Sequence, residues 1–556
     1  MRISKFEKWV VVIVSGLLWI VLALLAGGPI YSDEMLYIDA GLRNFAEPSY
    51  GNRYFHIYLQ KIFISIFSTP LAGVRVFWGF LISLTTTLVY LNAREITRRS
   101  TVLHGLLAVA FFFSFPLIIE YSGEPAVDIT AMAMTTIYLT VYLWAVKNPE
   151  KQKQALFILG VLAFLCLKTK ETTIFINVLL FGILKEEAKG KPGSKSLVNL
   201  IRSFLFGVVA GIGLFVLLDA VFLGQPFFAI APSTFSAIFT NYDYSPGFIF
   251  GPASWYKVYF LDELLLPFLL FLLGGVQLQR NVEDNIRIVW IYPLLFAVFL
   301  SWNMLKVPWG FIERFFFPAL PVIAILAPQA LRFKWPRKKR DWVWFIGSLI
   351  LSAALTLLMR SLWLETANKY SFEYTRMLDA VYYPILISIL LAVLIWERRA
   401  GWNRTIVQLF CIGALLFSPL LNNYKYFVTF PKIKERYVTV FYPFEIFRSK
   451  LEIMDNDQLY VSADLKTSQD MLSKDPNDIT GMYNFFFDAR INRNNVFLGY
   501  NQNNLGSDLL NRDFSFALLS ENDVHQLASI DLWNTVKEKF DYVYYDKNET
   551  VYLLTH

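Results

Sequence analysis

The chain is short of charged residues, cysteines and histidines, and each shortage argues against a class of protein. Only 17% of its 556 residues are charged and 56% are hydrophobic, whereas a soluble domain carries about 25% charged residues. The two cysteines both lie in apolar runs, which argues against a disulfide framework. The four histidines (His56, His104, His525 and His556) lack metal-ligand spacing and are interpreted as structural. The composition therefore indicates a polytopic α-helical membrane protein.

Apolar runs long enough to span a bilayer recur as far as residue 421. A span needs about 20 mostly apolar residues, and this rule predicts about 13 transmembrane helices. They are placed at residues 9–27, 74–93, 103–119, 128–146, 155–167, 173–184, 203–222, 260–278, 288–300, 315–331, 342–360, 381–396 and 405–421. The stretch 155–184 is predicted as two short helices broken at Lys168–Thr173, where charged and polar residues interrupt it.

The basic residues encode an orientation rather than a nucleic-acid site. The net charge is +7, but Lys and Arg lie in short loops between the apolar runs. They are several times denser in the loops that share a side with the N-terminus, which predicts a cytoplasmic N-terminus and an extracytoplasmic C-terminus. The first run lacks a small-residue cleavage site, so we expect a retained helix of a plasma or inner membrane protein.

Two long outer loops and a polar C-terminal region complete the predicted organisation: a membrane domain over 1–429 and a small extracytoplasmic α/β domain over 430–556. The loop 29–73 holds an amphipathic stretch at Tyr54–Phe67 that is expected to lie along the membrane surface. Its apolar residues near helical spacing are Phe55, Ile62, Phe63 and Ile66. The loop 223–257 is expected to be a mobile flap. In the C-terminal domain, strands are predicted at Gln458–Ala463, Asn495–Gly499, Phe514–Leu519 and Tyr542–Tyr545, and helical stretches at Ser468–Leu472 and His525–Phe540.

The candidate functional residues gather at the outer ends of the predicted helices. Asp33 and Glu34 directly follow the first span, where carboxylates are costly beside lipid and indicate a functional site. Further acids and several basic residues are predicted at the same level: Glu120, Glu124, Asp128, Lys168, Lys170, Lys306 and Arg314. One membrane face thus offers carboxylates that can accept a proton and cations that can hold an anion.

Simpler interpretations exist for most of these residues. Asp128 can be a helix N-cap, Lys168 and Lys170 can be interfacial anchors, and Arg314 can pair with Glu313. Asp33 and Glu34 are harder to explain in this way, because two adjacent acids cannot both be simple caps.

The order of these features resembles the GT-C superfamily of membrane glycosyltransferases that use polyprenyl-phosphate sugars. The resemblance covers most of residues 10–330, and its motifs are Ser32-Asp33-Glu34, Leu71–Arg75, Asp128, Leu167–Glu171 and Arg314–Pro321. The span count and the C-terminal domain are most similar to the branch that holds the lipid A aminoarabinose transferase, and protein O-mannosyltransferases share the early Asp-Glu. The chain departs from the commoner Lys-Gly-Pro of the fifth-span motif, having Lys170-Glu171-Thr172.

The resemblance implies an inverting sugar transfer at the outer membrane face. Asp33 would be the general base, and Glu34 and Asp128 would orient it or the acceptor, which would be a lipid, glycan or protein. Lys170 and Arg314, with Lys168, Glu124 and Lys306 nearby, would bind the donor phosphate or the acceptor. No cofactor is certain, and a divalent cation (Mg or Mn) held by Asp33, Glu34 and Asp128 stays open.

Three other classes remain open from the sequence. A lipid-linked sugar flippase or transporter would place ionisable residues near the bilayer midplane, where Asp219 is an ambiguous case. An oligosaccharide ligase or polymerase would use diphosphate-linked donors. A GT-C relative without catalytic activity would act as a binding subunit.

Overall fold

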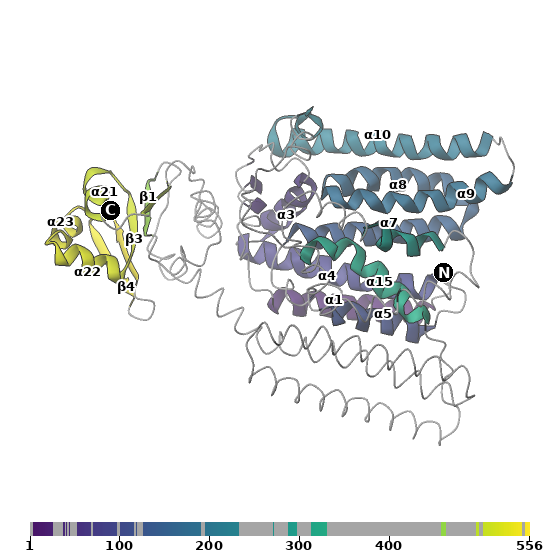
Figure 1. Cartoon of the computed structure of the whole chain (residues 1–556), viewed down its shortest axis with the longest axis horizontal. Coiled ribbons are helices and arrows are strands. Elements are labelled where there is room, and N and C mark those ends of the chain that lie inside the picture. The colour runs from purple at the N-terminus through teal and green to yellow at the C-terminus, as the bar shows by residue number, and fades with distance from the viewer. Residues whose placement is uncertain are drawn as a thin grey trace, which may run out of the picture.

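Figure 1 shows the computed structural model of the chain, with a helical bundle built from described residues up to 330 and a sheet-containing unit built from the C-terminal residues. The structure describes residues 4–25, 37–38, 40–41, 44, 53–67, 70–96, 101–115, 118, 126–190, 195–232, 271, 287–296, 313–330, 457–462, 496–499, 504–546 and 551–556. The predicted flap beyond residue 232, the span at 260–278 apart from one residue, the last three predicted spans and the helical stretch Ser468–Leu472 lie outside the described residues.

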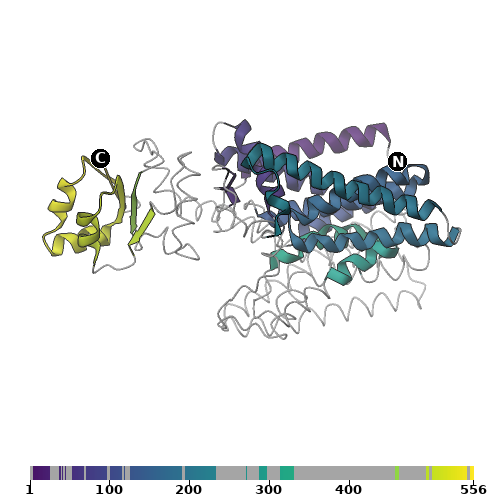
Figure 2. The ribbon, with the colours of Figure 1, turned by 90° about the horizontal axis from the view of Figure 1, so that it is seen from above.

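The bundle consists of α-helices that run roughly along one direction, joined by short 3₁₀ helices (Figures 1 and 2). The α-helices are α1 (Lys5–Leu25), α3 (Tyr54–Ile66), α4 (Pro70–Glu95), α5 (Val102–Ser114), α7 (Val127–Lys147), α8 (Gln152–Leu167), α9 (Leu180–Gly190), α10 (Lys195–Leu223) and α15 (Leu320–Leu326). The 3₁₀ helices are η3 (Pro149–Lys151), η4 (Glu171–Leu179), η5 (Phe228–Ile230), η7 (Glu313–Ala319) and η8 (Ala327–Ala330). A further short apolar helix covers Arg287–Phe296.

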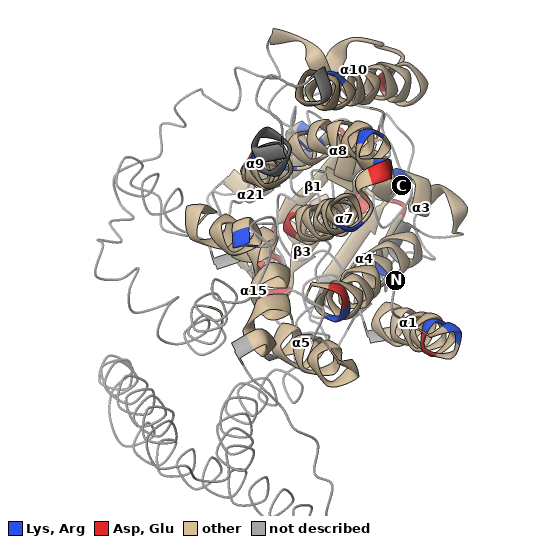
Figure 3. Ribbon diagram, turned by 90° about the vertical axis from the view of Figure 1, so that its right-hand side faces the viewer, with Lys and Arg blue, Asp and Glu red and all other residues tan. Residues whose placement is uncertain are grey.

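Four helices among the described residues, α1, α4, α7 and α10, are long and apolar enough to cross a membrane. Seen along the bundle in Figure 3, α7 lies in the centre, and α1 and α10 lie at the periphery. Large apolar side chains on the peripheral helices face outward, as with Leu24 (76% exposed) and Val221 (68%). Such apolar surface is unfavourable in water and suits lipid, so the protein is an integral membrane protein.

Glycines allow α8 and α10 to cross at unusually close range. A Cβ atom on Gly160 would lie 2.1 Å from the Phe204 carbonyl oxygen, and one on Gly207 would lie 2.0 Å from the Phe157 carbonyl oxygen. Gly211, one turn further along α10, approaches the α8 backbone at Val161. Small residues of this kind let membrane helices pack backbone against backbone.

The ends of the bundle near the N-terminus are fixed by ion pairs between neighbouring helices. Arg94 at the end of α4 donates to Glu7 of α1 (Nε–Oε1 2.7 Å), and the Tyr90 hydroxyl donates to the same carboxylate (2.7 Å). Lys147 at the end of α7 pairs with Glu95. Charged residues accordingly lie at the helix ends that face the viewer in Figure 3.

The predicted break after residue 167 is confirmed, but the prediction of one helix over 173–184 is wrong. α8 ends at Leu167, and residues 171–179 form the 3₁₀ helix η4 before α9 begins. The predicted span at 315–331 is also interrupted, since α15 is only seven residues long and is flanked by η7 and η8. Pro318 lies inside η7, and proline removes a helical hydrogen bond and clashes with the preceding turn.

The stretch predicted at Tyr54–Phe67 is the helix α3, and part of its predicted apolar side is exposed. Ile62 and Ile66 are 41% and 69% exposed, and the buried residues of α3 are Tyr54, His56, Ile57, Tyr58, Gln60 and Ile64. Polar and aromatic side chains thus face the protein, because they find partners on α4, α7 and α10. The exposed isoleucines remain available to lipid.

The C-terminal unit is a five-stranded sheet with three short helices. The strands are β1 (Leu459–Ser462), β2 (Val496–Gly499), β3 (Phe516–Ser520), β4 (Tyr542–Asp546) and β5 (Val551–Thr555), and the helices are α21 (Leu505–Asn511), α22 (Glu521–Ser529) and α23 (Trp533–Glu538). The order is β2-β1-β3-β5-β4, with β1 parallel to both neighbours and β5 antiparallel to β3 and β4. This agrees with the α/β character expected from the sequence.

The four predicted strands are present, whereas β5 and α21 were missed. The stretch predicted as one helix at His525–Phe540 is two helices, α22 and α23. Asp531 between them has a φ of 57°, a left-handed conformation that a continuous helix cannot contain. Ser520 caps α22 by accepting from the Asp523 backbone N–H (3.1 Å).

Candidate active site at one end of the helix bundle

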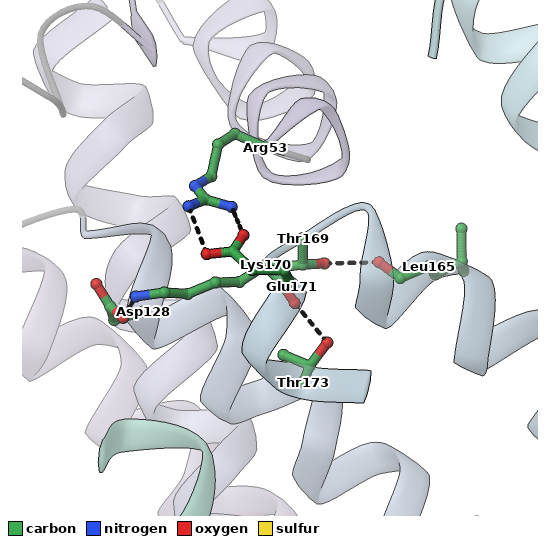
Figure 4. A network of polar contacts seen from close by, with 7 residues as sticks. All are labelled: Arg53, Asp128, Leu165, Thr169, Lys170, Glu171 and Thr173. Carbon is green, nitrogen blue, oxygen red and sulfur yellow. Dashed lines mark hydrogen bonds and ion pairs between the residues drawn. The ribbon is translucent and has the colours of Figure 1, made fainter. Parts of the chain in front are cut away.

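The candidate site lies at the end of the bundle opposite the N-terminus, where α7 begins, α8 and α10 end, and α3 packs against them (Figures 1 and 4). Its centre is the segment 168–171, which joins α8 to η4. The three ionic side chains of this segment are directed to three different helices.

Local hydrogen bonds fix the backbone of this segment. The Lys170 N–H donates to the Cys166 carbonyl (3.0 Å), and the Thr169 hydroxyl donates to the Leu165 carbonyl (2.8 Å). The Thr173 hydroxyl then donates to the Lys170 carbonyl (2.7 Å). Polar side chains therefore satisfy the carbonyl groups that a helix end leaves without partners.

Lys170 forms an ion pair with Asp128, which lies in the first turn of α7 (Figure 4). The two side chains are only 3% and 1% exposed. The N-cap residue of α7 is Ala126 and Asp128 lies inside the first turn, so the ion pair accounts for its position better than the N-cap interpretation. Removing two charges from water costs several kcal/mol per ion unless geometry compensates, and such buried charges within a membrane protein are a functional-site hypothesis by default.

Glu171 turns the other way and binds Arg53, the residue before α3 (Figure 4). The contact is two-pronged, with Nη1–Oε2 at 2.5 Å and Nη2–Oε1 at 3.2 Å. Burial alone would raise the pKa of Glu171, but the charge and hydrogen bonds of Arg53 outweigh it and lower the pKa to about 2. Glu171 is therefore ionised at neutral pH. A backbone hydrogen bond also joins α3 to this segment, since the Phe55 N–H donates to the Lys168 carbonyl (3.1 Å).

Lys168 is directed to a third partner, Asp219 near the end of α10. Burial lowers the pKa of Lys168 to about 8, and the Asp219 carboxylate opposes this shift. Asp219 also accepts a hydrogen bond from the Tyr58 hydroxyl of α3 (2.6 Å), and all three residues are buried. Asp219 thus lies near the C-terminal end of α10 and joins that helix to α3.

The structure brings together only part of the predicted residue set. Lys170 and Asp128 are in contact, whereas Lys168 faces Asp219 on α10. The Arg314 backbone belongs to η7, which packs on α7. Asp33, Glu34, Glu120, Glu124 and Lys306 lie outside the described residues. Sequence reasoning missed Arg53, Tyr58 and Glu171 as parts of this network, although Glu171 stands within the Leu167–Glu171 motif.

The described residues contain no group of three His, Cys, Asp or Glu side chains that could hold a metal ion. Asp128 is the member of the predicted metal set that is described, and it is bound to Lys170. A cation at Asp128 would lie beside an ammonium group, so this carboxylate does not fit a metal ligand in the arrangement observed.

No protein-family model matches the chain, and no curated protein matches it. Solved structures do match it over nearly its whole length. ArnT from Cupriavidus metallidurans in the apo state has a TM-score of 0.56 at 15% identity, covering 99% of this chain and 98% of that one. The same protein bound to undecaprenyl phosphate has a TM-score of 0.54 at 14% identity, with the same coverage. The archaeal oligosaccharyltransferase AglB from Archaeoglobus fulgidus has a TM-score of 0.41 at 13% identity, covering 99% of this chain and 74% of that one.

At these identities the likeness to ArnT establishes the fold alone. It confirms the predicted resemblance in fold to the lipid A aminoarabinose transferase.

Proposed function

We propose that this protein, a membrane chain with the GT-C fold, is an inverting glycosyltransferase that moves a sugar from a polyprenyl-phosphate donor to an acceptor hydroxyl. The acceptor would be a lipid, a glycan or a protein at the extracytoplasmic face. The fold likeness to ArnT supports the donor class, because one of the ArnT structures is bound to undecaprenyl phosphate. The N-terminus would be cytoplasmic and residues 430–556 extracytoplasmic.

The observation that carries the proposal is the buried Lys170–Asp128 pair at the outer end of α7 and α8. Transfer from a phosphate requires a cation that stabilises the charge growing on the leaving group. An ammonium group has three N–H donors, so Lys170 can keep Asp128 as a partner and still donate to a phosphate oxygen. Arg53 and Lys168 add positive charge around the same segment, although each has its own carboxylate partner.

The proposed reaction needs one proton acceptor and one stabilised leaving group. Asp33 takes the proton from the acceptor hydroxyl while its oxygen attacks the anomeric carbon. The bond between that carbon and the phosphate oxygen breaks with inversion, and the polyprenyl phosphate leaves against Lys170 and Arg314. Glu34, Glu124 and Asp128 orient the acceptor, and Lys306 contributes to anion binding. We assign no step to a divalent cation.

Donor binding should weaken when either proposed phosphate ligand is replaced. Lys170→Ala and Arg314→Lys should each lose about tenfold in affinity for the polyprenyl-phosphate donor, since a charged hydrogen bond contributes roughly 1.5–3 kcal/mol. Arg314→Lys is informative because an ammonium group cannot reproduce the planar two-pronged contact of a guanidinium. Binding and single-turnover rate are measured in nanodiscs, with Lys153→Ala, an exposed site on α8, as the control.

Unchanged donor binding in both variants would contradict the phosphate site. Preference for a diphosphate-linked oligosaccharide over a phosphate-linked monosaccharide would favour a ligase or polymerase. Movement of the lipid-linked sugar across the bilayer without transfer to an acceptor would favour a flippase.

The orientation can be checked by cysteine labelling. Cysteine placed at Asn548 should react with an impermeant reagent from outside the cell, and cysteine placed at Lys338 should react only after permeabilisation, because basic loops stay in the cytoplasm. The native protein is the control for background labelling, and its Cys166 is buried. Labelling of the Asn548 position from the cytoplasmic side would contradict the proposed topology.

A further inference from the structure

One side of α3 carries two buried polar side chains whose hydrogen-bonding capacity is not fully used among the described residues. His56 and Gln60 are each 1% exposed, and their spacing of four residues places them on the same side of the helix, one turn apart. Within the part of the chain that the structure describes, His56 Nε2 and both polar atoms of the Gln60 amide lack a hydrogen-bond partner. Leaving a buried polar group unpaired costs about 1–3 kcal/mol, so a polar partner is expected at these atoms.

This side of α3 packs against the first turns of α7, the helix that carries Asp128. His56 Nδ1 and the Thr130 hydroxyl form a hydrogen bond of 2.7 Å, and Thr130 lies on α7 two residues after Asp128. The bond fixes the orientation of the imidazole ring and leaves Nε2 as its second polar atom. α3 itself begins at Arg53, which is held by Glu171, so one helix connects the ionic segment to these neutral groups.

The chemistry of the two side chains selects a neutral ligand. Burial and the Arg53 charge together lower the pKa of His56 to about 3, so the ring is uncharged at neutral pH. A neutral imidazole and a carboxamide can each donate and accept hydrogen bonds, which matches hydroxyl groups, since a hydroxyl group also both donates and accepts. Aromatic rings flank His56, with Tyr37 at 5.9 Å and Phe77 at 5.8 Å between ring centres, and small-molecule sites commonly combine apolar walls with few polar groups.

We propose that His56 and Gln60 form a hydroxyl-binding subsite for the sugar of the lipid-linked donor. The subsite deepens the proposed function and rests on it: Lys170 would hold the phosphate, and α3 would hold the sugar that the phosphate carries. A buried water molecule is the simpler occupant of such groups, and the two occupants predict different binding results.

The test compares two lipids that differ only in the sugar. Gln60→Met keeps the length of the side chain and removes its donors and acceptors. Affinities are measured in nanodiscs for undecaprenyl phosphate and for undecaprenyl phosphate carrying glucose, mannose or arabinose. Gln60→Met should weaken binding of the preferred sugar-linked lipid by about tenfold, the value of one to two net hydrogen bonds, and leave binding of undecaprenyl phosphate within about twofold. Thr130→Val removes the hydrogen bond that orients the His56 ring and should also weaken binding of the sugar-linked lipid. Ser65→Ala, on the exposed side of α3, is the control and should change neither affinity.

Three outcomes would overturn the subsite. Equally weakened binding of both lipids would show that the α3 residues act on the fold or on phosphate binding. Unchanged affinities with a shifted unfolding temperature would show that His56 and Gln60 bind a buried water molecule. A native protein that binds no sugar-linked lipid more tightly than undecaprenyl phosphate would also exclude a sugar subsite. Failure of the native protein to bind any of these lipids would contradict the proposed function itself, which distinguishes the two failures.

Discussion

Replacing Asp33 with Asn should lower the rate of sugar transfer by about a hundred- to ten-thousand-fold, the range that a general base contributes. The amide keeps the size of the carboxylate but cannot take the proton of the acceptor hydroxyl. Donor affinity should change little, because the donor phosphate is assigned to Lys170 and Arg314. Single-turnover transfer and donor binding in nanodiscs measure the two effects separately.

Asp128→Asn is the comparison variant for this experiment. It should impair transfer less than Asp33→Asn, yet it should lower the unfolding temperature, because it removes the carboxylate that neutralises buried Lys170. Asp33→Asn with near-native turnover would remove Asp33 from the role of base. Asp33→Asn that fails to accumulate as folded protein would instead assign that residue to stability.

Gly207→Ala should destabilise the membrane domain by about 3 kcal/mol, the upper part of the range for overpacking. The added Cβ would lie 2.0 Å from the Phe157 carbonyl oxygen of α8, and the backbone cannot rotate away as a side chain can. α8 and α10 would have to separate, and Lys168 and Asp219 lie at the C-terminal ends of these two helices. We therefore expect lost activity together with a lower unfolding temperature in detergent.

Gly213 offers a matched control on the same helix, because a Cβ there meets no atom within 4 Å. Gly213→Ala should leave stability unchanged or raise it by up to about 1 kcal/mol, since alanine favours helix over glycine. Equal unfolding temperatures for Gly207→Ala and Gly213→Ala would contradict the close crossing of α8 and α10.

The candidate site was predictable where charge and position act together. Lys170 and Asp128 stand at the ends of apolar runs, where an ionisable residue is costly and so conspicuous. The interaction of Lys168 with Asp219 was not predictable. Lys168 and Lys170 stand two positions apart on an irregular segment, and side chains on such a segment can face different helices. His56 was interpreted as structural because the histidines lack the spacing of metal ligands. Only the structure shows that its ring is buried with Nε2 unpaired among the described residues, which suggests a ligand-binding role.

The sequence by itself determined that the chain spans a membrane, that α8 breaks after residue 167 and that the C-terminal residues mix strands and helices. These properties follow from runs of apolar residues, from charges that interrupt them and from alternation in short strands, all of which are local. Only the tertiary structure decided which side of α3 is buried and where α8 crosses α10. It also decided which carboxylate interacts with Lys168 and which with Lys170. These outcomes depend on contacts between residues far apart in the sequence: Lys170 and Asp128 are 42 positions apart, and Tyr58 and Asp219 are 161 apart. Local sequence patterns carry no record of such distant partners.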